Sequence, residues 1–334
     1  MEQDTILRDR AARIVAIAED RREVTLSGRE IVIAGGDAEA ERIAVETIAG
    51  MIASRPGPSW AVAALAALTE RGAGIVLRGP NHESHCLAWP VPNRRWPARI
   101  RAQLDLYPPY ARHLLRQLER ARDAQRVLAL ETMGGKGKLH ALKAAPLAMR
   151  GRRMARRTRA EIAAEIARHY WPWLVGRGFR RDPARPGANA VINCGHTALR
   201  IAAVRAVHAA GLHPGAGLHE RVGLADDLMI PFRPVVDLAA AVFIATGSDR
   251  VDAHIEAAFA RLLEAPLRGR RGPVQIGFAL AELGRALAHC FETGAQRLDL
   301  MLAARQDPDT LFALMQGSAI RDQESGLGGA GLRP

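Results

Sequence analysis

A short segment, GLHERVGLADDLMIPFRPVVD at residues 217–237, concentrates side chains that can bind metal ions or transfer protons. It places His219, Glu220 and Asp227 among apolar residues and prolines. Carboxylates and an imidazole in one place are ligands that divalent cations accept in proteins. Where a helix would present one more acidic group, a turn after Asp227, the chain has Ile230. The segment is therefore a working metal site, the frame of one that has lost its donors, or no metal site at all.

Arginine-rich segments are the second chemical feature, and phosphate is the ligand that they favour. In the run MRGRRMARRTRAE, helical spacing places Arg152 with Arg156 on one face, and Arg153 with Arg157 on the next. These cationic rows repel one another unless phosphates lie between them, although such runs are also found as solvated arms. Two loops, GRGFRRDPARPG and PLRGRRGP, have the same character. The candidate DNA-binding residues are Arg150, Arg152, Arg153, Arg156, Arg157, Arg159, Arg177, Arg180, Arg181, Arg268, Arg270 and Arg271.

The overall composition agrees with a polyanionic partner. The chain has 334 residues and a formal net charge of +12, and its sequence pI is near 10.8. A surplus of this size, clustered in segments, is typical of proteins that bind nucleic acid. A genome that favours Arg and Ala would also produce such a charge, and so would a protein-interaction module with an acidic partner.

The cysteines and histidines favour neither disulfides nor zinc. Cys86, Cys194 and Cys290 are far apart and form no CxxC pair, which fits a reducing cytoplasm. In NHESHC, His82 and His85 stand beside Cys86, but no second ligand pair follows at zinc-finger spacing. We therefore expect this hexapeptide to be a polar turn after a strand.

Common enzyme motifs and targeting segments are missing from the sequence. It contains no P-loop, no GxSxG, no HExxH and no dinucleotide-binding glycine pattern after a strand. Its first residues, MEQDTILRDR, are charged, and its longest apolar run is too short to span a bilayer. These features predict a cytoplasmic protein that does not enter a membrane.

The sequence predicts an α+β fold with a small β-rich domain followed by a larger helical one. Aromatic residues make up 4% of the chain, and Ala and Leu supply much of its apolar bulk, which favours helices. We expect a β-rich domain at 1–90 for dimerisation or DNA contact, a proline-containing linker at 91–98, a helical domain at 99–320 and a disordered tail at 321–334. Expected strands lie at 12–20, 22–28, 29–36, 42–50 and 74–79, with a hairpin-like rhythm among the first three, and an amphipathic helix lies at 59–74. Helical periodicity marks 98–106, 108–131, 158–175, 189–211, 249–265 and 274–294.

Three ordered blocks between residues 163 and 237 resemble a known family. They are RHYWPWLVGRGFRRD, GANAVINCGHTALRIAAVRAVHAAGLHPGAGLH and LADDLMIPFRPVVD. They are similar to the blocks of the CRISPR adaptation integrase, most closely its type II-like branch, where LADDLMEPFRPxVD is expected. The structural residues that carry this resemblance are Tyr170, Trp171, Asp226, Pro231, Phe232, Arg233 and Pro234.

The resemblance implies a metal-dependent integrase that works as a dimer of dimers around a small adaptor dimer. Such an enzyme captures a short DNA fragment and joins its 3′ ends to a CRISPR array by transesterification. A divalent metal would activate the attacking hydroxyl and stabilise charge on the phosphate.

The metal-ligand positions that the resemblance implies are replaced. A glutamate is expected seven residues before Tyr170, where the chain has Ala163. The latter histidine of GxHH becomes Glu220, and the glutamate of DLMEPFRP becomes Ile230. Two tyrosines of an NYGY block become Cys194 and His196. We therefore expect no intact catalytic set and no metal or other cofactor.

The leading prediction is a catalytically inactive, integrase-like protein that binds double-stranded DNA in spacer acquisition or a derived antiviral complex. It would form a homodimer and pair with a small CRISPR adaptor protein or with an active integrase paralogue. An alternative is an active endonuclease or integrase with Mg²⁺ or Mn²⁺ in a rearranged site of His219, Glu220 and Asp227. A second alternative is a protein-interaction scaffold that does not bind DNA.

Overall fold

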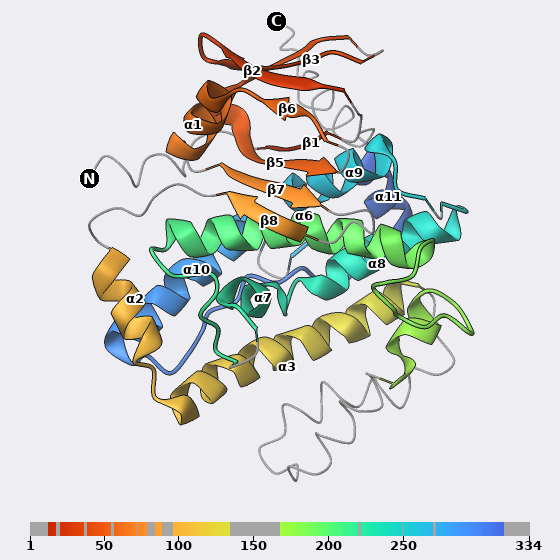
Figure 1. Ribbon diagram of the computed structural model, residues 1–334. Helices are drawn as coiled ribbons and strands as arrows, with labels where there is room; N and C mark the ends of the chain where they lie inside the picture. Colours follow the sequence, from red (N-terminus) through yellow and green to blue (C-terminus); the bar gives the residue numbers. More distant parts are fainter. Residues whose placement is uncertain are drawn as a thin grey trace, which may run out of the picture.

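The computed structural model describes residues 13–17, 21–36, 39–54, 57–71, 73–78, 84–88, 96–133, 168–219, 222–248, 250–269 and 272–316. Strands dominate the N-terminal part and helices the remainder (Figure 1). The predicted α+β class, a small β-rich region before a larger helical one, is confirmed.

The outer sheet has the strand order β4-β3-β2-β6. Strands β2 (Glu23–Ser27) and β3 (Glu30–Ala34) form an antiparallel hairpin, and β3 pairs in turn with β4 (Glu41–Ala44). Gly28 turns this hairpin with a φ of +61°, a conformation that glycine adopts without a steric penalty. The two-residue strand β6 (Ser59–Trp60) pairs with β2 in parallel. The hairpin predicted from the second and third strand segments is thus confirmed.

The second sheet, ordered β1-β5-β7-β8, has a different topology from the predicted hairpin rhythm. Strand β1 (Arg13–Ile17) pairs in parallel with β5 (Ile48–Ser54), and β5 pairs in parallel with β7 (Gly74–Arg78). The 3-10 turn η1 (Val45–Thr47) leads into β5 from β4. Parallel pairing requires a crossover, and α1 (Val62–Glu70) provides it between β5 and β7.

The predicted polar turn around NHESHC is wrong. His85 and Cys86 lie in β8 (Ser84–Ala88), which pairs antiparallel with β7, while His82 lies outside the described residues. The strand forms because an edge partner for β7 satisfies backbone groups that a turn would leave unpaired.

Two clusters of buried apolar residues stabilise these parts. One joins the two sheets and α1 through residues such as Val24, Ile43, Met51 and Leu68. The other runs through the helices and includes Ile52 and Val76 on the side of β5 and β7 that faces them. The second sheet therefore supplies apolar side chains to both clusters.

The helical part is built around α6 (Ala188–Ala209), which lies between the second sheet and the other long helices (Figure 1). It contacts α8 (Arg233–Ala245), α9 (Ala253–Glu264) and α10 (Ile276–Thr293). The helix is rich in Ala, and at its single glycine, Gly195, side chains of neighbouring helices approach closely. The remaining named helices are α2 (Trp96–Leu104), α3 (Pro108–Thr132), α7 (Leu224–Met229) and α11 (Pro308–Gln316).

Most predicted helices are confirmed to within a few residues of their ends. The segment 158–175 is described only from Arg168 onward, where the backbone is helical to Leu174. Residues 96–98, expected in the linker, form the first turn of α2. The arginine run at 150–159, Ala163, Glu220 and the tail at 321–334 lie outside the described residues. None of the helices within the described ranges combines the length and apolarity that crossing a bilayer requires.

Replacing Gly195 with alanine should lower the free energy of unfolding by about 1–3 kcal/mol, because a Cβ there overpacks the core. That Cβ would lie 2.6 Å from Phe259 Cε1 and 2.6 Å from Val236 Cγ1. Gly277→Ala in α10 is the matched control, since its Cβ would meet Leu263 O at an ordinary 3.6 Å. Urea denaturation followed by circular dichroism compares the variants, and equal stability of the two would contradict the packing around α6.

Candidate functional site

The corner between α7 and α8 is held together by one carboxylate and two guanidinium groups. Arg200 on α6 donates to both oxygens of Asp226, with Nη1 3.0 Å from Oδ2 and Nη2 2.6 Å from Oδ1. Arg233, the first residue of α8, donates to Oδ1 of the same carboxylate at 3.1 Å. Bidentate arginine–carboxylate pairs are the stronger kind of ion pair. Asp226 therefore ties α7 to both α6 and α8, one turn before Ile230.

A second carboxylate, Asp237 on α8, is held by a phenol and an imidazole. The Tyr170 hydroxyl donates to Oδ2 at 3.0 Å, and His196 Nε2 lies 2.7 Å from Oδ1. Both Tyr170 and Asp237 are buried. Burial raises the pKa of Tyr170 well above 10, and the Asp237 carboxylate adds to that rise. The phenol therefore keeps its proton and serves as a hydrogen-bond donor.

Two arginines of α3 pair with Asp123, and one of them also contacts Tyr170. Arg122 Nε lies 3.0 Å from Asp123 Oδ1, and Arg126 Nη1 lies 3.7 Å from the same oxygen. The Arg126 guanidinium also stands over the Tyr170 ring, 5.0 Å from its centroid. A cation over an aromatic face is attracted by the ring quadrupole, so this contact helps to position α3.

Burial determines the electrostatics of the arginines at this corner. It lowers the pKa of Arg126, Arg181 and Arg233, and in each case the negative charge of Asp237 acts in the opposite direction. An arginine keeps its charge in proteins, so the cost of burial is offset by the neighbouring aspartates. The positive charges of the buried arginines at this corner are therefore balanced by carboxylates of the same chain.

Asp227 is the most deeply buried of the acidic residues here, with an exposed fraction of 0%. Its Oδ2 accepts a hydrogen bond from the Leu218 amide at 2.6 Å. Burial raises the pKa of Asp227 to about 7, although the amides of Leu218 and His219 act in the opposite direction. The close approach requires Gly217, because a Cβ there would lie 2.8 Å from Oδ2. Asp227 thus anchors the 217–219 turn to α7.

The described residues at this corner do not fit a divalent cation. No group of three His, Cys, Asp or Glu side chains within the described ranges is arranged to hold a metal ion. His219 is exposed whereas Asp227 is buried, and Ile230 packs against the apolar core at the position of the expected carboxylate. Of the three replaced ligand positions, Ile230 is described, and Ala163 and Glu220 lie outside the described residues.

The motif residues around Ile230 serve the packing of the corner. Pro231 and Phe232 are buried, and Pro234 occupies the first turn of α8, where proline is tolerated. Trp171 is half-buried and contacts Phe179 and Tyr170.

The arginines of the loop at 176–187 differ in how far they are exposed to solvent. Arg181 turns inward, where Nη1 donates to Asn189 Oδ1 at 3.0 Å and the guanidinium stands 6.0 Å from the Trp171 ring centroid. Arg177 and Arg180 are exposed. Among the sequence candidates for DNA contact, Arg177 and Arg180 are thus accessible here, and Arg181 is engaged within the chain.

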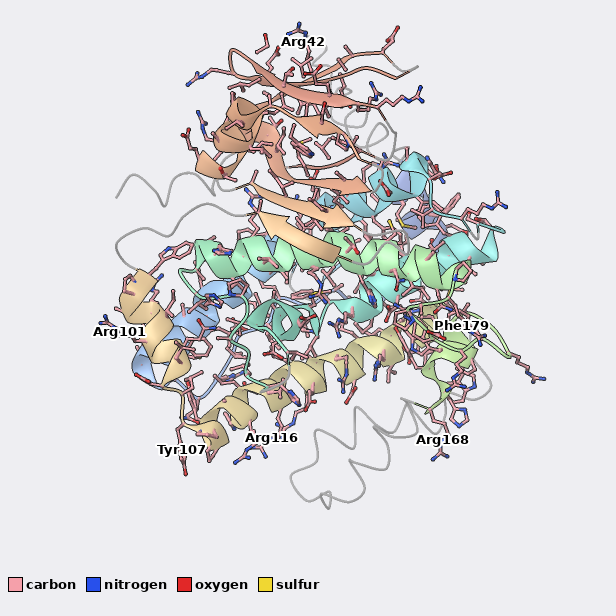
Figure 2. All side chains as sticks on the ribbon, in the orientation of Figure 1. Arg42, Arg101, Tyr107, Arg116, Arg168 and Phe179 are labelled. Atoms are coloured by element: carbon pink, nitrogen blue, oxygen red, sulfur yellow. The ribbon has the colours of Figure 1, made fainter. Side chains whose placement is uncertain are left out.

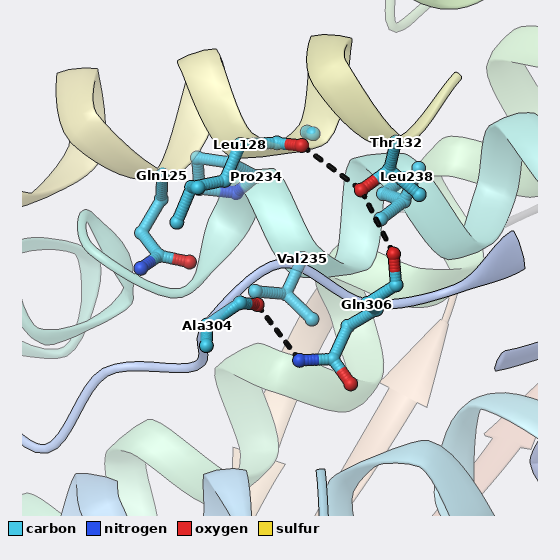
Figure 3. Close-up of a pocket in the computed structure, with 9 residues that line it drawn as sticks. Gln125, Leu128, Thr132, Pro234, Val235, Leu238, Ala304 and Gln306 are labelled. Carbon is cyan, nitrogen blue, oxygen red and sulfur yellow. Dashed lines mark hydrogen bonds between the residues drawn. The ribbon is translucent and has the colours of Figure 1, made fainter. Parts of the chain in front are cut away.

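A shallow cleft between α3, α8 and the segment before α11 is lined by Gln125, Leu128, Ala129, Thr132, Pro234, Val235, Leu238, Ala304 and Gln306 (Figure 3). Its polar groups bind the chain itself. Thr132 Oγ1 donates to Gln306 O at 3.1 Å, and Gln306 Nε2 donates to Ala304 O and Arg268 O at 2.8 Å each. The Arg268 amide donates back to Gln306 Oε1 at 3.1 Å, and the Arg268 side chain is exposed. The residues around the cleft therefore form a structural joint that holds the backbone at Arg268. The other two arginines predicted for this loop, Arg270 and Arg271, lie outside the described residues.

The family model for "CRISPR associated protein Cas1" matches residues 15–262. The chain belongs to the Cas1 family. No curated protein matches it.

Solved structures share the fold of this Cas1-family chain at low sequence identity. A structure titled "Casposase bound to integration product" has a TM-score of 0.67 and 18% identity, and covers 86% of this chain and 92% of that one. A Cas1 protein from Thermotoga maritima has a TM-score of 0.62 and 13% identity, and the match covers 84% of this chain and 97% of that one. A chain of a "Cas6-RT-Cas1--Cas2 complex" has a TM-score of 0.66 and 15% identity. That chain is longer, so the match covers 89% of this chain but 36% of that one. The similarity to the adaptation integrase family noted in the sequence is confirmed.

Several residues of this Cas1-family corner were not singled out as site residues from the sequence. Arg200 lies 26 positions from its partner Asp226, and His196 lies 41 positions from Asp237. No local pattern marks these pairs, because they form only when α6 packs against α7 and α8. The sequence does place Arg200 in the second family block, as the arginine of its Leu-Arg pair. That block does not indicate which residue Arg200 binds.

Replacing Asp227 with asparagine should flatten the pH dependence of stability between about pH 5 and pH 7. The pKa of Asp227 is raised from 3.8 to about 7, so the folded state binds this proton more tightly than the unfolded chain. In that window the free energy of unfolding of the natural protein should therefore fall as pH rises, by at most about 1.4 kcal/mol per pH unit. In Asp227→Asn this contribution is lost, while the amide oxygen still accepts from Leu218 N–H.

Urea denaturation at pH 5, 6, 7 and 8 measures this difference. The control is Asp252→Asn, an exposed N-cap of α9 where asparagine caps as well as aspartate. Parallel pH profiles for the natural protein and Asp227→Asn would contradict a raised pKa at Asp227.

Proposed function

We propose that this Cas1-family protein holds DNA through its arginines and does not carry out metal-dependent strand joining. The observation that carries the proposal is the environment of Ile230. An apolar side chain packs against the core where the family resemblance expects a ligand carboxylate. A cation at this position would face methyl groups in place of oxygen donors.

The neighbouring carboxylates do not compensate for this loss. Asp226 is bound by Arg200 and Arg233, and Asp237 by Tyr170 and His196. Asp227 accepts a hydrogen bond from the 217–219 turn. Recruiting any of them to a metal would break contacts that hold helices together, at a cost of the order of 1–3 kcal/mol for each buried partner left unpaired.

DNA binding is supported by charge and by the relatives. The net charge is +12, and Arg177, Arg180 and Arg268 are exposed on loops whose backbone is held by internal contacts. Contacts from guanidinium groups to a phosphate backbone need charge and shape rather than a metal. The titles of similar structures name a casposase on an integration product and a complex that contains Cas1 and Cas2. We extend this to double-stranded DNA, a homodimer, and a Cas2-type adaptor or active Cas1 paralogue as partners of this chain.

A second candidate function rests on the contact between Asp227 and the turn that carries His219. Asp227 lies in α7 and accepts a hydrogen bond from this turn, and Glu220 directly follows His219 in the sequence, so a rearranged site of these three residues is the competing assignment. Joining of a labelled fragment into supercoiled plasmid with Mg²⁺ or Mn²⁺, abolished by Asp227→Ala, would favour it.

The proposal predicts that DNA binding is independent of metal and sensitive to salt. Anisotropy of a labelled duplex should give the same Kd in EDTA and in Mg²⁺. Affinity should fall at least tenfold between 50 and 200 mM salt if several phosphates are contacted, because counterions are released on binding. A requirement for Mg²⁺, or indifference to salt, would overturn the proposal.

Restoring the three ligand types should restore metal binding, whereas restoring one should not. The triple variant Ala163→Glu, Glu220→His and Ile230→Glu should gain a Tm increase of several degrees in Mn²⁺, because a ligand that binds only the folded state stabilises it. Ile230→Glu alone is the control and should show no such increase. If the natural protein is already stabilised by Mn²⁺ to the same extent, the assignment of an inert site is wrong.

A further inference from the structure

Helix α2 is attached to the helical part by polar side chains more than by apolar packing. Of its nine residues only Gln103 is buried, and Ala102 is half-buried against the apolar cluster. The next helix, α3, buries eleven residues, most of them apolar. A short helix has little stability of its own in water, because its nucleation is unfavourable and few hydrogen bonds follow to offset it. The contacts of Gln103 and its neighbours therefore determine whether α2 stays in place.

Gln103 uses its side-chain amide to hold one segment of backbone. Its Oε1 accepts a hydrogen bond from the His213 amide at 2.8 Å. Its Nε2 donates to His213 O at 2.9 Å and to Ala216 O at 2.5 Å. The segment 213–216 follows the end of α6 and precedes the 217–219 turn. One side chain of α2 therefore fixes the path of the chain as it leaves α6.

Two further residues of α2 contact the end of α6 itself. Arg99 Nη1 donates at 2.9 Å to the carbonyl of Ala210, the C-cap residue of α6, where a helix leaves its last carbonyls without intrahelical partners. Arg99 Nε also donates to Glu292 Oε1 on α10 at 2.7 Å. The Trp96 ring lies 5.1 Å, centroid to centroid, from the His208 ring in the last turn of α6. Helix α2 thus caps α6 and bridges it to α10.

The outer side of α2 is uncovered within the described part of the chain. Arg101 and Leu104 are exposed, Leu104 by 64%. Figure 2 shows Arg101 at the outer edge of the molecule and Tyr107 at the tip beyond the end of the helix. Because α2 forms a single layer over the end of α6, its departure displaces no other described element.

The segment that α2 holds leads directly to α7. Pro214 O accepts a hydrogen bond from the Ala225 amide at 3.3 Å. Just beyond the segment, the Leu218 amide donates to Asp227 Oδ2 at 2.6 Å. Whatever holds 213–216 in place therefore also holds the 217–219 turn against α7.

We infer that α2 is a strap, residues 96–104, that opens on its own and thereby controls the mobility of the 217–219 turn. In the open state α2 leaves the end of α6 and the backbone of 213–216 is hydrogen-bonded to water, while α6, α8 and α10 stay folded. This order follows from burial, since local opening occurs first where few apolar side chains are buried. Helix α6 buries fourteen residues, whereas α2 buries one. The inference is separate from the proposed function, because no step of it involves DNA.

The place of the strap in the chain gives it a regulatory consequence. Helix α2 is the first described element after β8, so it stands where the chain enters the helical part. A molecule that binds only the open or only the closed strap shifts the equilibrium between them. Such a molecule would act on the turn that carries His219 without touching it.

Hydrogen–deuterium exchange of the full-length protein tests the strap. In the natural protein, the amides of α2, His213 and Leu218 should exchange through one shared opening, and faster than amides in the middle of α6 such as Val204. Low concentrations of urea should leave the rates of the first group nearly unchanged, because a local opening exposes little surface.

Gln103→Ala should accelerate exchange at Leu218 by about tenfold or more, because the strap opens more often. Leu218 is the informative amide, since its own acceptor, Asp227, is unchanged. Arg99→Ala removes a different contact of the strap and should accelerate Leu218 in the same way, which a purely local role of Gln103 would not produce. Both variants should leave Val204 unchanged.

Gln117→Ala is the matched control. Gln117 on α3 holds another segment in the same manner, with Oε1 accepting from the Leu298 amide at 3.0 Å and Nε2 donating to Gln296 O at 2.9 Å. Its replacement should accelerate exchange at Leu298 and leave Leu218 unchanged.

Three results would overturn the inference. Equal protection of α2 and α6 in the natural protein would show that α2 opens only with global unfolding, and this measurement decides the question even if a variant does not fold. Unchanged exchange at Leu218 in Gln103→Ala and Arg99→Ala would show that the turn is independent of α2. Acceleration of Leu218 by Gln117→Ala to the same extent would show a general loosening of the helical part in place of a strap.

Discussion

The helical part of this protein depends on the rule that a buried carboxylate must be bound by a partner. Asp226, Asp227 and Asp237 lie within twelve positions of one another and are used by three different sets of donors. Arginines, backbone amides and a Tyr–His pair each hold one of them. Because the donors and the carboxylates belong to different elements, these contacts tie α6, α7, α8, the helical turn at Tyr170 and the 217–219 turn to one another.

This use of the carboxylates explains how the Cas1-family corner can be stable around an isoleucine. In a metal site, carboxylates without a cation repel one another, so the ion contributes to stability. Here guanidinium groups and amide donors neutralise or solvate the charge, and Ile230 adds apolar contact. The described contacts of this corner therefore account for its packing without a cation beside Ile230.

The sequence predicted the elements with strong periodicity and missed those that depend on context. The long helices α3, α6 and α10 repeat apolar residues with helical spacing, and their ends lie close to the predicted ones. Helix α8 was missed because Pro231 and Pro234 discourage a helix, yet proline is acceptable in a first turn. Parallel pairing of β1 with β5 joins segments more than thirty residues apart, which no local pattern reveals. For the same reason the residue types of the corner could be read from the family blocks, but the Arg200–Asp226 and His196–Asp237 pairs could not.

The joint at Gln306 has a mechanical consequence for the surface around it. Thr132 belongs to the end of α3, and Arg268 to a loop after α9, so a single glutamine connects two elements far apart in the chain. These hydrogen bonds hold the loop that carries Arg268 in place relative to the end of α3. Any molecule that contacted both the Arg268 side chain and the end of α3 would therefore meet them at a separation that this joint sets.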